Sequence, residues 1–149
     1  MAYEGLEQSP NIIYTGAAPN QQVIPAIKWS LDHIGKRFYL IGSDYVWPHS
    51  INEIMKDTIR ALGAELVGED YIFFVSANVS PAVHKIKLAQ PDVIISSVVG
   101  DSNKAVYQAL TDAGLSADRG QGGYGSLGEE QLPSLPIASP TAQYRARAY

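Results

Sequence analysis

The pattern of apolar and polar positions predicts several strands of a buried sheet. Strands that are covered on both faces have nearly continuous apolar sequences instead of alternating ones. Runs of this kind occur at 37–43 (RFYLIGS) and 92–99 (DVIISSVV), and 64–75 (AELVGEDYIFFV) is a further run typical of strands. A shorter run with the composition of a strand lies at 11–15 (NIIYT). We therefore expect strands at these places, with 64–75 forming either one strand or two pieces.

Helical spacing is found between these runs. Apolar residues recur every three or four positions, and a glycine follows the last of them, as at many helix ends. The segments with this spacing are 23–34, 51–62 and 105–113, and the glycines are Gly35, Gly63 and Gly114. Ser50 and Glu53 have the spacing of a capping box, so we expect the second helix to begin after Ser50. Ser80 with Pro81 predicts the start of a further helix, and Ser102 predicts the cap of the last one.

Strands that alternate with helices of this length indicate a particular fold class. They are joined by parallel crossover connections, which predicts a three-layer α/β/α fold with a mostly parallel sheet. The regularity ends after Leu115, and the rest of the chain is rich in glycine and proline with little periodicity. We therefore expect an α/β lobe at 1–115 and an irregular tail at 116–149, which is a degenerate continuation of the lobe.

Composition limits the classes of function. The chain of 149 residues has a net charge of −4 and no cluster of lysine or arginine, which argues against nucleic acid as a partner. It has no cysteine, which excludes disulfides, thiol catalysis and thiolate metal sites. His33, His49 and His84 fall on separate predicted elements without a shared ligand spacing. We expect neither a metal site nor a cofactor.

The sequence also carries no signal for a membrane. No stretch approaches the roughly 20 apolar residues that are needed to span a bilayer. The first residues, MAYEGLEQSPN, lack both the basic start and the apolar core of a signal peptide. As written, the chain is expected to remain in the cytoplasm.

Two segments have the placement of a ligand site. In an open parallel sheet, ligands bind outside the carboxyl ends of the strands, where loops lead into helices. The segments 42–50 (GSDYVWPHS) and 98–103 (VVGDSN) are predicted loops at this edge, so Tyr45, Trp47 and Asp101 can converge there. Aromatic faces, hydrogen-bonding groups and helix N-termini suit a small, planar, polar ligand with donors and acceptors. The alternatives are that Tyr45 and Trp47 pack beneath their loop, and that Asp101 only caps a helix.

The chain offers no arrangement for catalysis. No serine, histidine and aspartate, and no pair of carboxylates, have a spacing from which a catalytic site can be argued. The sequence therefore predicts a protein that is not an enzyme and has no catalytic residues.

Several segments resemble a known family. They are YEGLEQSPNIIYTGAAPNQQVIPAIKW, GSDYVWP, KIKLAQPDVIISSVVGDSN and LGEEQLPSLP, and the resemblance runs from about Tyr3 to Pro136. These segments are similar to the urea and short-chain-amide binding proteins of ABC transporters. Those proteins have the type I periplasmic binding fold and are related to branched-chain amino-acid binders and to the amide sensor that regulates amidase expression.

The resemblance implies an incomplete lobe and a set of ligand-binding residues. Proteins of this family have two α/β lobes that close on a ligand, and this chain resembles only the crossing segment and the first part of the second lobe. The aromatic residues of the motif Gly-Ser-Asp-Tyr-x-aromatic-Pro face the ligand in the family, which implies this role for Tyr45 and Trp47. The segment after the later strand lines the cleft, which implies a role for Val99, Gly100 and Asp101. Two departures from the family are Trp47, where Tyr or Phe is more familiar, and GQGGYGS, which stands in place of an apolar strand.

The resemblance also implies a function and partners. The first expectation is a solute-binding component of an ABC transporter for urea or short-chain amides, with a periplasmic or cell-surface parent protein and an ABC permease as partner. The alternatives are an amide-sensing regulatory lobe that controls amidase expression, or a branched-chain amino-acid binding protein. The exposed cleft surface of the isolated lobe also predicts a homo-oligomer.

Overall fold

The computed structural model describes residues 9–13, 18–73, 78–115 and 122–125. These residues form an α/β fold with one parallel sheet of strand order β2-β1-β3-β4. The strands are β1 (Arg37–Ser43), β2 (Glu65–Ile72), β3 (Val93–Ser97) and β4 (Gly122–Gly125). The helices are α1 (Pro19–His33), α2 (Val46–Ala61), α3 (Ser80–Ala89) and α4 (Ser102–Asp112). The predicted fold class is confirmed.

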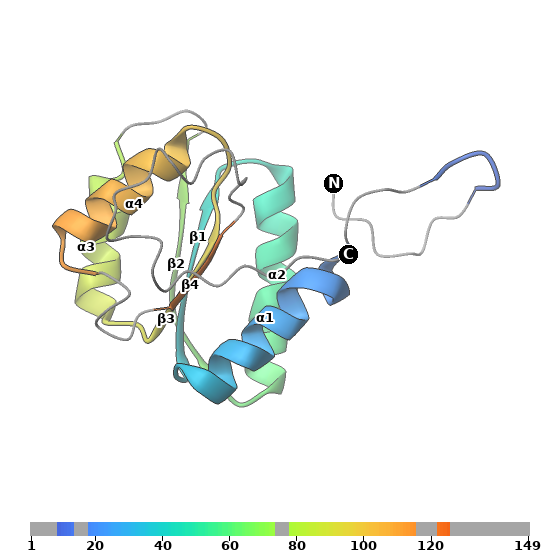
Figure 1. The fold of residues 1–149 in the computed structure, drawn as a ribbon, viewed down its shortest axis with the longest axis horizontal. Helices are drawn as coiled ribbons and strands as arrows, with labels where there is room; N and C mark the ends of the chain where they lie inside the picture. Colours follow the sequence, from blue (N-terminus) through green and yellow to red (C-terminus); the bar gives the residue numbers. More distant parts are fainter. Residues whose placement is uncertain (1–8, 14–17, 74–77, 116–121, 126–149) are drawn as a thin grey trace.

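Two helical layers cover the sheet, with α1 and α2 on one face and α3 and α4 on the other (Figure 1). Residues of β1 alternate between the two cores, because successive side chains of a strand point to opposite faces. Phe38 and Leu40 pack in the core beneath α1 and α2, whereas Tyr39 and Ile41 pack in the core beneath α3 and α4. All four side chains are buried, which explains the continuous apolar run.

The predicted glycines at the helix C-termini are confirmed, but the predicted N-terminal cap residues are not. Gly63 and Gly114 follow α2 and α4 with φ of 71° and 74°, a backbone conformation that favours glycine. α2 begins at Val46, and Ser50 lies inside it, where its hydroxyl donates to the Val46 carbonyl at 2.8 Å. The predicted capping box is therefore wrong.

Pro48 is compatible with this earlier start of the helix. Proline is tolerated in the first turn, because the backbone N–H groups there have no partner within the helix. The segment 42–50, expected to be a loop, is therefore mostly the end of β1 and the beginning of α2. Ser80 and Ser102 are likewise the first residues of α3 and α4 instead of their caps, and neither cap residue makes a side-chain capping bond.

Two further segments differ from expectation or extend it. Residues 11–13 form a turn and irregular chain instead of a strand, and Ile13 is 90% exposed, so it has no core to pack against. The prediction is wrong there, and positions 14 and 15 lie outside the described residues. β4 lies within the expected irregular tail and pairs with β3. No helix in the described part of the chain is long and apolar enough to cross a membrane.

Candidate ligand-binding site

The ends of two neighbouring strands bring the two predicted segments together. β1 ends at Ser43 and leads into α2, and β3 ends at Ser97 and leads toward α4. The Ser43 hydroxyl accepts a hydrogen bond of 3.2 Å from the backbone N–H of Val99. This bond joins the segment before Tyr45 to the segment before Gly100. The N-terminal turns of α2 and α4 therefore follow two strand ends that are bonded to each other.

Tyr45 and Trp47 lie at the start of α2, not in a loop. Tyr45 is the N-cap residue, in an extended conformation, and Trp47 is in the first turn. Both side chains are half-buried, and neither belongs to the two hydrophobic cores of the described chain. The Tyr45 hydroxyl is protonated at neutral pH and can donate a hydrogen bond, and burial raises its pKa further. Val46, between the two aromatic residues, is 65% exposed.

The second segment consists of a glycine with a positive φ angle, followed by the start of α4. Gly100 has φ of 66°, and a Cβ atom added to it would meet nothing within 4 Å. Val99 is half-buried, and Asp101 is exposed as the N-cap residue of α4, without a side-chain capping bond. Asp101 thus occupies the N-cap position that the alternative interpretation gave it, but its carboxylate does not cap the helix.

Two buried polar residues that were not predicted as site residues lie next to these. Ser102 and Asn103, in the first turn of α4, are only 3% and 1% exposed. Ser102 Oγ and both Asn103 side-chain polar atoms have no hydrogen-bond partner in the part of the protein that the structure describes. The signal was available, since Asn103 shares the helical spacing of the buried residues Val106, Tyr107 and Leu110.

Other chemistry is sparse at this edge. Asp44 Oδ1 and His49 Nε2 are 2.8 Å apart, and the His49 ring stacks on Tyr71. Ser50, which is close in sequence, donates its hydroxyl to a backbone carbonyl instead. Among the described residues, no group of three acidic or histidine side chains is arranged to hold a metal ion.

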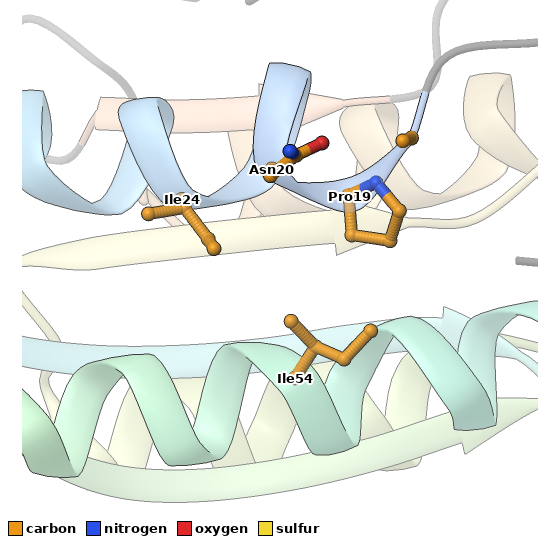
Figure 2. Close-up of a pocket in the computed structure, with 5 residues that line it drawn as sticks. Pro19, Asn20, Ile24 and Ile54 are labelled. Atoms are coloured by element: carbon orange, nitrogen blue, oxygen red, sulfur yellow. The ribbon is translucent and has the colours of Figure 1, made fainter. Parts of the chain in front are cut away.

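A separate groove lies between α1 and α2. It has a volume of about 230 Å³ and is lined by Ala18, Pro19, Asn20, Ile24 and Ile54. Figure 2 shows the stick-drawn residues of α1 on one side and Ile54 of α2 on the other. The lining is mostly apolar and contains none of the predicted site residues, so the groove is not part of the candidate site.

Comparisons with known proteins identify a family and similar folds. Residues 1–149 match the family described as periplasmic binding protein domain. A solute-binding protein of an ABC transporter from Rhodopseudomonas palustris HaA2, in complex with p-hydroxybenzoic acid, is similar with a TM-score of 0.77 at 23% identity, over 87% of this chain and 36% of that one. A branched-chain amino-acid ABC transporter periplasmic ligand-binding protein from Burkholderia xenovorans LB400 has a TM-score of 0.69 at 18% identity, over 85% and 33%.

A third structure extends the same pattern. An ABC transporter substrate-binding protein from Sphaerobacter thermophilus has a TM-score of 0.74 at 18% identity, over 88% of this chain and 37% of that one. At these identities the likeness concerns the fold. The chain spans about a third of the length of each of these proteins.

Proposed function

Because the chain belongs to the periplasmic binding protein family, we propose that it is part of the solute-binding component of an ABC transporter. We propose urea or a short-chain amide as the solute, and an ABC permease as the partner of the parent protein. The parent protein would act in the periplasm or at the cell surface. The observation that carries the proposal is the bond between Ser43 and Val99, which joins the starts of α2 and α4 at one edge of the sheet.

The chemistry of this edge supports a planar ligand with donors and acceptors. Tyr45 and Trp47 offer aromatic surface, and the first turn of α4 offers backbone N–H groups. Asn103 adds one unsatisfied acceptor and one unsatisfied donor. An amide or urea supplies both complementary groups, whereas an ionised carboxylate supplies only acceptors and would leave Asn103 Oδ1 without a donor. Because Asn103 is buried, a ligand reaches it only through a local rearrangement at this edge.

The competing ligand class is an amino acid. The ammonium group of an amino acid also supplies donors, and the exposed Asp101 carboxylate at this edge is suited to accept from it. One of the similar structures is a complex with p-hydroxybenzoic acid, and another is described as a branched-chain amino-acid ABC transporter ligand-binding protein. An amide-sensing regulatory role would use the same site with a different partner, and a neighbouring amidase gene instead of permease genes would favour it.

The affinity of this chain alone is expected to be low. Urea has four heavy atoms, and the best small ligands gain at most about 1.5 kcal/mol per heavy atom, which bounds a complete cleft near −6 kcal/mol, or roughly tens of micromolar. If this chain supplies about half of the contacts, the dissociation constant is several millimolar or weaker, on the order of a −3 kcal/mol interaction. Each hydrogen bond made on a wet surface adds only about 1 kcal/mol.

Weak binding of this kind is measured by NMR titration of the ¹⁵N-labelled chain. We expect acetamide to shift the Gly100 amide and the Trp47 indole signals, and benzoate and leucine to shift them less. Tyr45→Ala and Trp47→Ala should abolish the acetamide shifts, while the control Trp29→Ala on α1 should leave them. Shifts caused by leucine or benzoate alone would overturn the amide proposal. Tight binding that survives both site variants would place the site elsewhere.

A further inference from the structure

The start of α2 is seated on the sheet with almost no free space. An ideal Cβ built on Gly42 would lie 2.7 Å from Ser97 Oγ, 2.9 Å from Pro48 Cβ and 3.2 Å from Tyr71 Cε1. Contacts under 3.0 Å are essentially never tolerated, so only glycine fits without a shift of its neighbours. The first turn of α2 therefore rests directly against β1, and it does so beside a serine and a tyrosine from the two flanking strands.

One side chain of α2 connects these flanking strands. Asn52 is 1% exposed, and its Oδ1 accepts from Ser97 Oγ of β3 at 3.2 Å. Its Nδ2 donates to the Tyr71 hydroxyl at 3.1 Å and to Glu69 Oε1 at 3.4 Å, both on β2. A single carboxamide thus bonds α2 to the strands on either side of β1, with both its donor and its acceptor engaged.

Tyr71 extends this network to the residue before Tyr45. Its hydroxyl donates to Glu69, and its ring stacks on the His49 ring with centroids 3.7 Å apart. His49 in turn contacts the Asp44 carboxylate at 2.8 Å. Burial, together with the bond to Glu69, raises the pKa of the Tyr71 hydroxyl, which keeps it protonated as a donor.

We propose that Asn52 and Tyr71 are positioning residues, which hold the first two turns of α2 and thereby place Tyr45 and Trp47 at the ligand edge. This inference rests on the proposed function only where it assigns Asn52 and Tyr71 a role in ligand binding. Its structural part concerns the orientation of the α2 start. Without the Tyr71 hydroxyl, Asn52 Nδ2 retains only the longer bond to Glu69.

Trp47 provides a direct probe of this orientation. The chain has two tryptophans, so the Trp29→Phe variant leaves Trp47 as the only one. In this background we expect Tyr71→Phe to shift the Trp47 emission maximum and to increase its quenching by acrylamide. The matched control is Tyr39→Phe, which also removes a tyrosine hydroxyl bonded to a carboxylate, that of Asp70, but on the opposite face of the sheet. It should leave both readouts unchanged.

The outcomes separate positioning from general destabilisation and from the proposed function. Equal changes in Tyr71→Phe and Tyr39→Phe, or none in either, would overturn the inference. If Tyr71→Phe does not fold, His49→Ala decides, because this exposed residue provides the ring stack on Tyr71 and the contact with Asp44, and its loss should change the quenching in the same direction. The fluorescence uses no ligand, so it decides the positioning even if no solute binds. If acetamide binds, unaltered acetamide shifts in Tyr71→Phe would overturn the role in binding.

Discussion

Replacement of Asn103 by leucine should stabilise the protein. Asn103 is 1% exposed and its side-chain polar atoms have no hydrogen-bond partner among the described residues, so within this part of the protein their removal from water is not compensated. An unsatisfied buried polar group costs about 1–3 kcal/mol, and leucine has a similar size without that cost. After some loss through imperfect packing, we expect the free energy of unfolding to rise by about 1–2 kcal/mol. For a chain of this size that corresponds to an increase in Tm of roughly 2–8 °C.

Asn52→Leu is the matched control, because Asn52 is also 1% exposed and also lies in a helix. Its carboxamide is bonded to Ser97 and Tyr71, so leucine would leave these partners short of bonds. We expect this variant to lose about 1–3 kcal/mol. The assay is unfolding in guanidinium chloride followed by circular dichroism, since urea is the proposed ligand and would confound its own use as a denaturant.

The pair of variants tests the reasoning by the sign of the change. A stabilised Asn103→Leu that has also lost the acetamide-induced NMR shifts would support both the unsatisfied state of Asn103 and its part in binding. If Asn103→Leu is destabilised as strongly as Asn52→Leu, Asn103 has a partner in the folded protein and the argument from its unsatisfied atoms fails.

Two more predictions concern pH and association. Burial alone would raise the pKa of the Glu69 carboxyl, but hydrogen bonds from Tyr71 and Lys56 outweigh it, so the pKa is lowered. The stabilisation by ionised Glu69 is then complete above the pKa of about 4.3 that this carboxyl has in the unfolded chain, and it is lost as the pH falls through the lower pKa of the folded protein. Below about pH 4.3, the Tm of Glu69→Gln should therefore fall less steeply with decreasing pH than that of the wild type. Val46 and Phe73 are 65% and 77% exposed, so the isolated chain should self-associate. Light scattering should show a smaller mass for a variant with both residues changed to serine, and a monomeric wild type at high concentration would contradict this.

β1 and β3 were predictable because their burial on both faces is written in continuous apolar sequence, whereas β4, with the sequence GGYG, has no such run. Phe38 to Ile41 have to be apolar, since alternate residues enter two different cores. The start of α2 was not predictable in the same way, because the Ser50–Glu53 spacing suggested a later helix that follows a loop at 42–50. Pro48 lies instead in the first turn, where its missing N–H costs nothing, and Gly42 provides the space for it beside β1.

The placement of the two candidate segments at one edge of the sheet was predictable, whereas the hydrogen bonds there were not. That Tyr45 and Gly100 follow neighbouring strand ends comes from the parallel topology, which the apolar pattern indicated. The bond between Ser43 and Val99 joins residues 56 positions apart, and no local pattern reports it. Whether a buried polar side chain is satisfied depends on such distant partners, so Asn103 was read only as part of a helix start.

Under the proposed function, the same residue type serves stability at Asn52 and binding at Asn103. Asn52 lies on α2 where hydroxyls from β2 and β3 meet it, and its bonds make the helix start rigid. Asn103 lies in the first turn of α4, beyond the end of β3, where no described group meets it. If stability were the only requirement, an apolar side chain would serve better at position 103, whereas a binding site gains from polar atoms whose partner arrives with the ligand. A stabilising substitution that costs binding is therefore the expected property of this position, and a rigid α2 beside an unsatisfied α4 start is the arrangement in which a solute can supply the missing bonds.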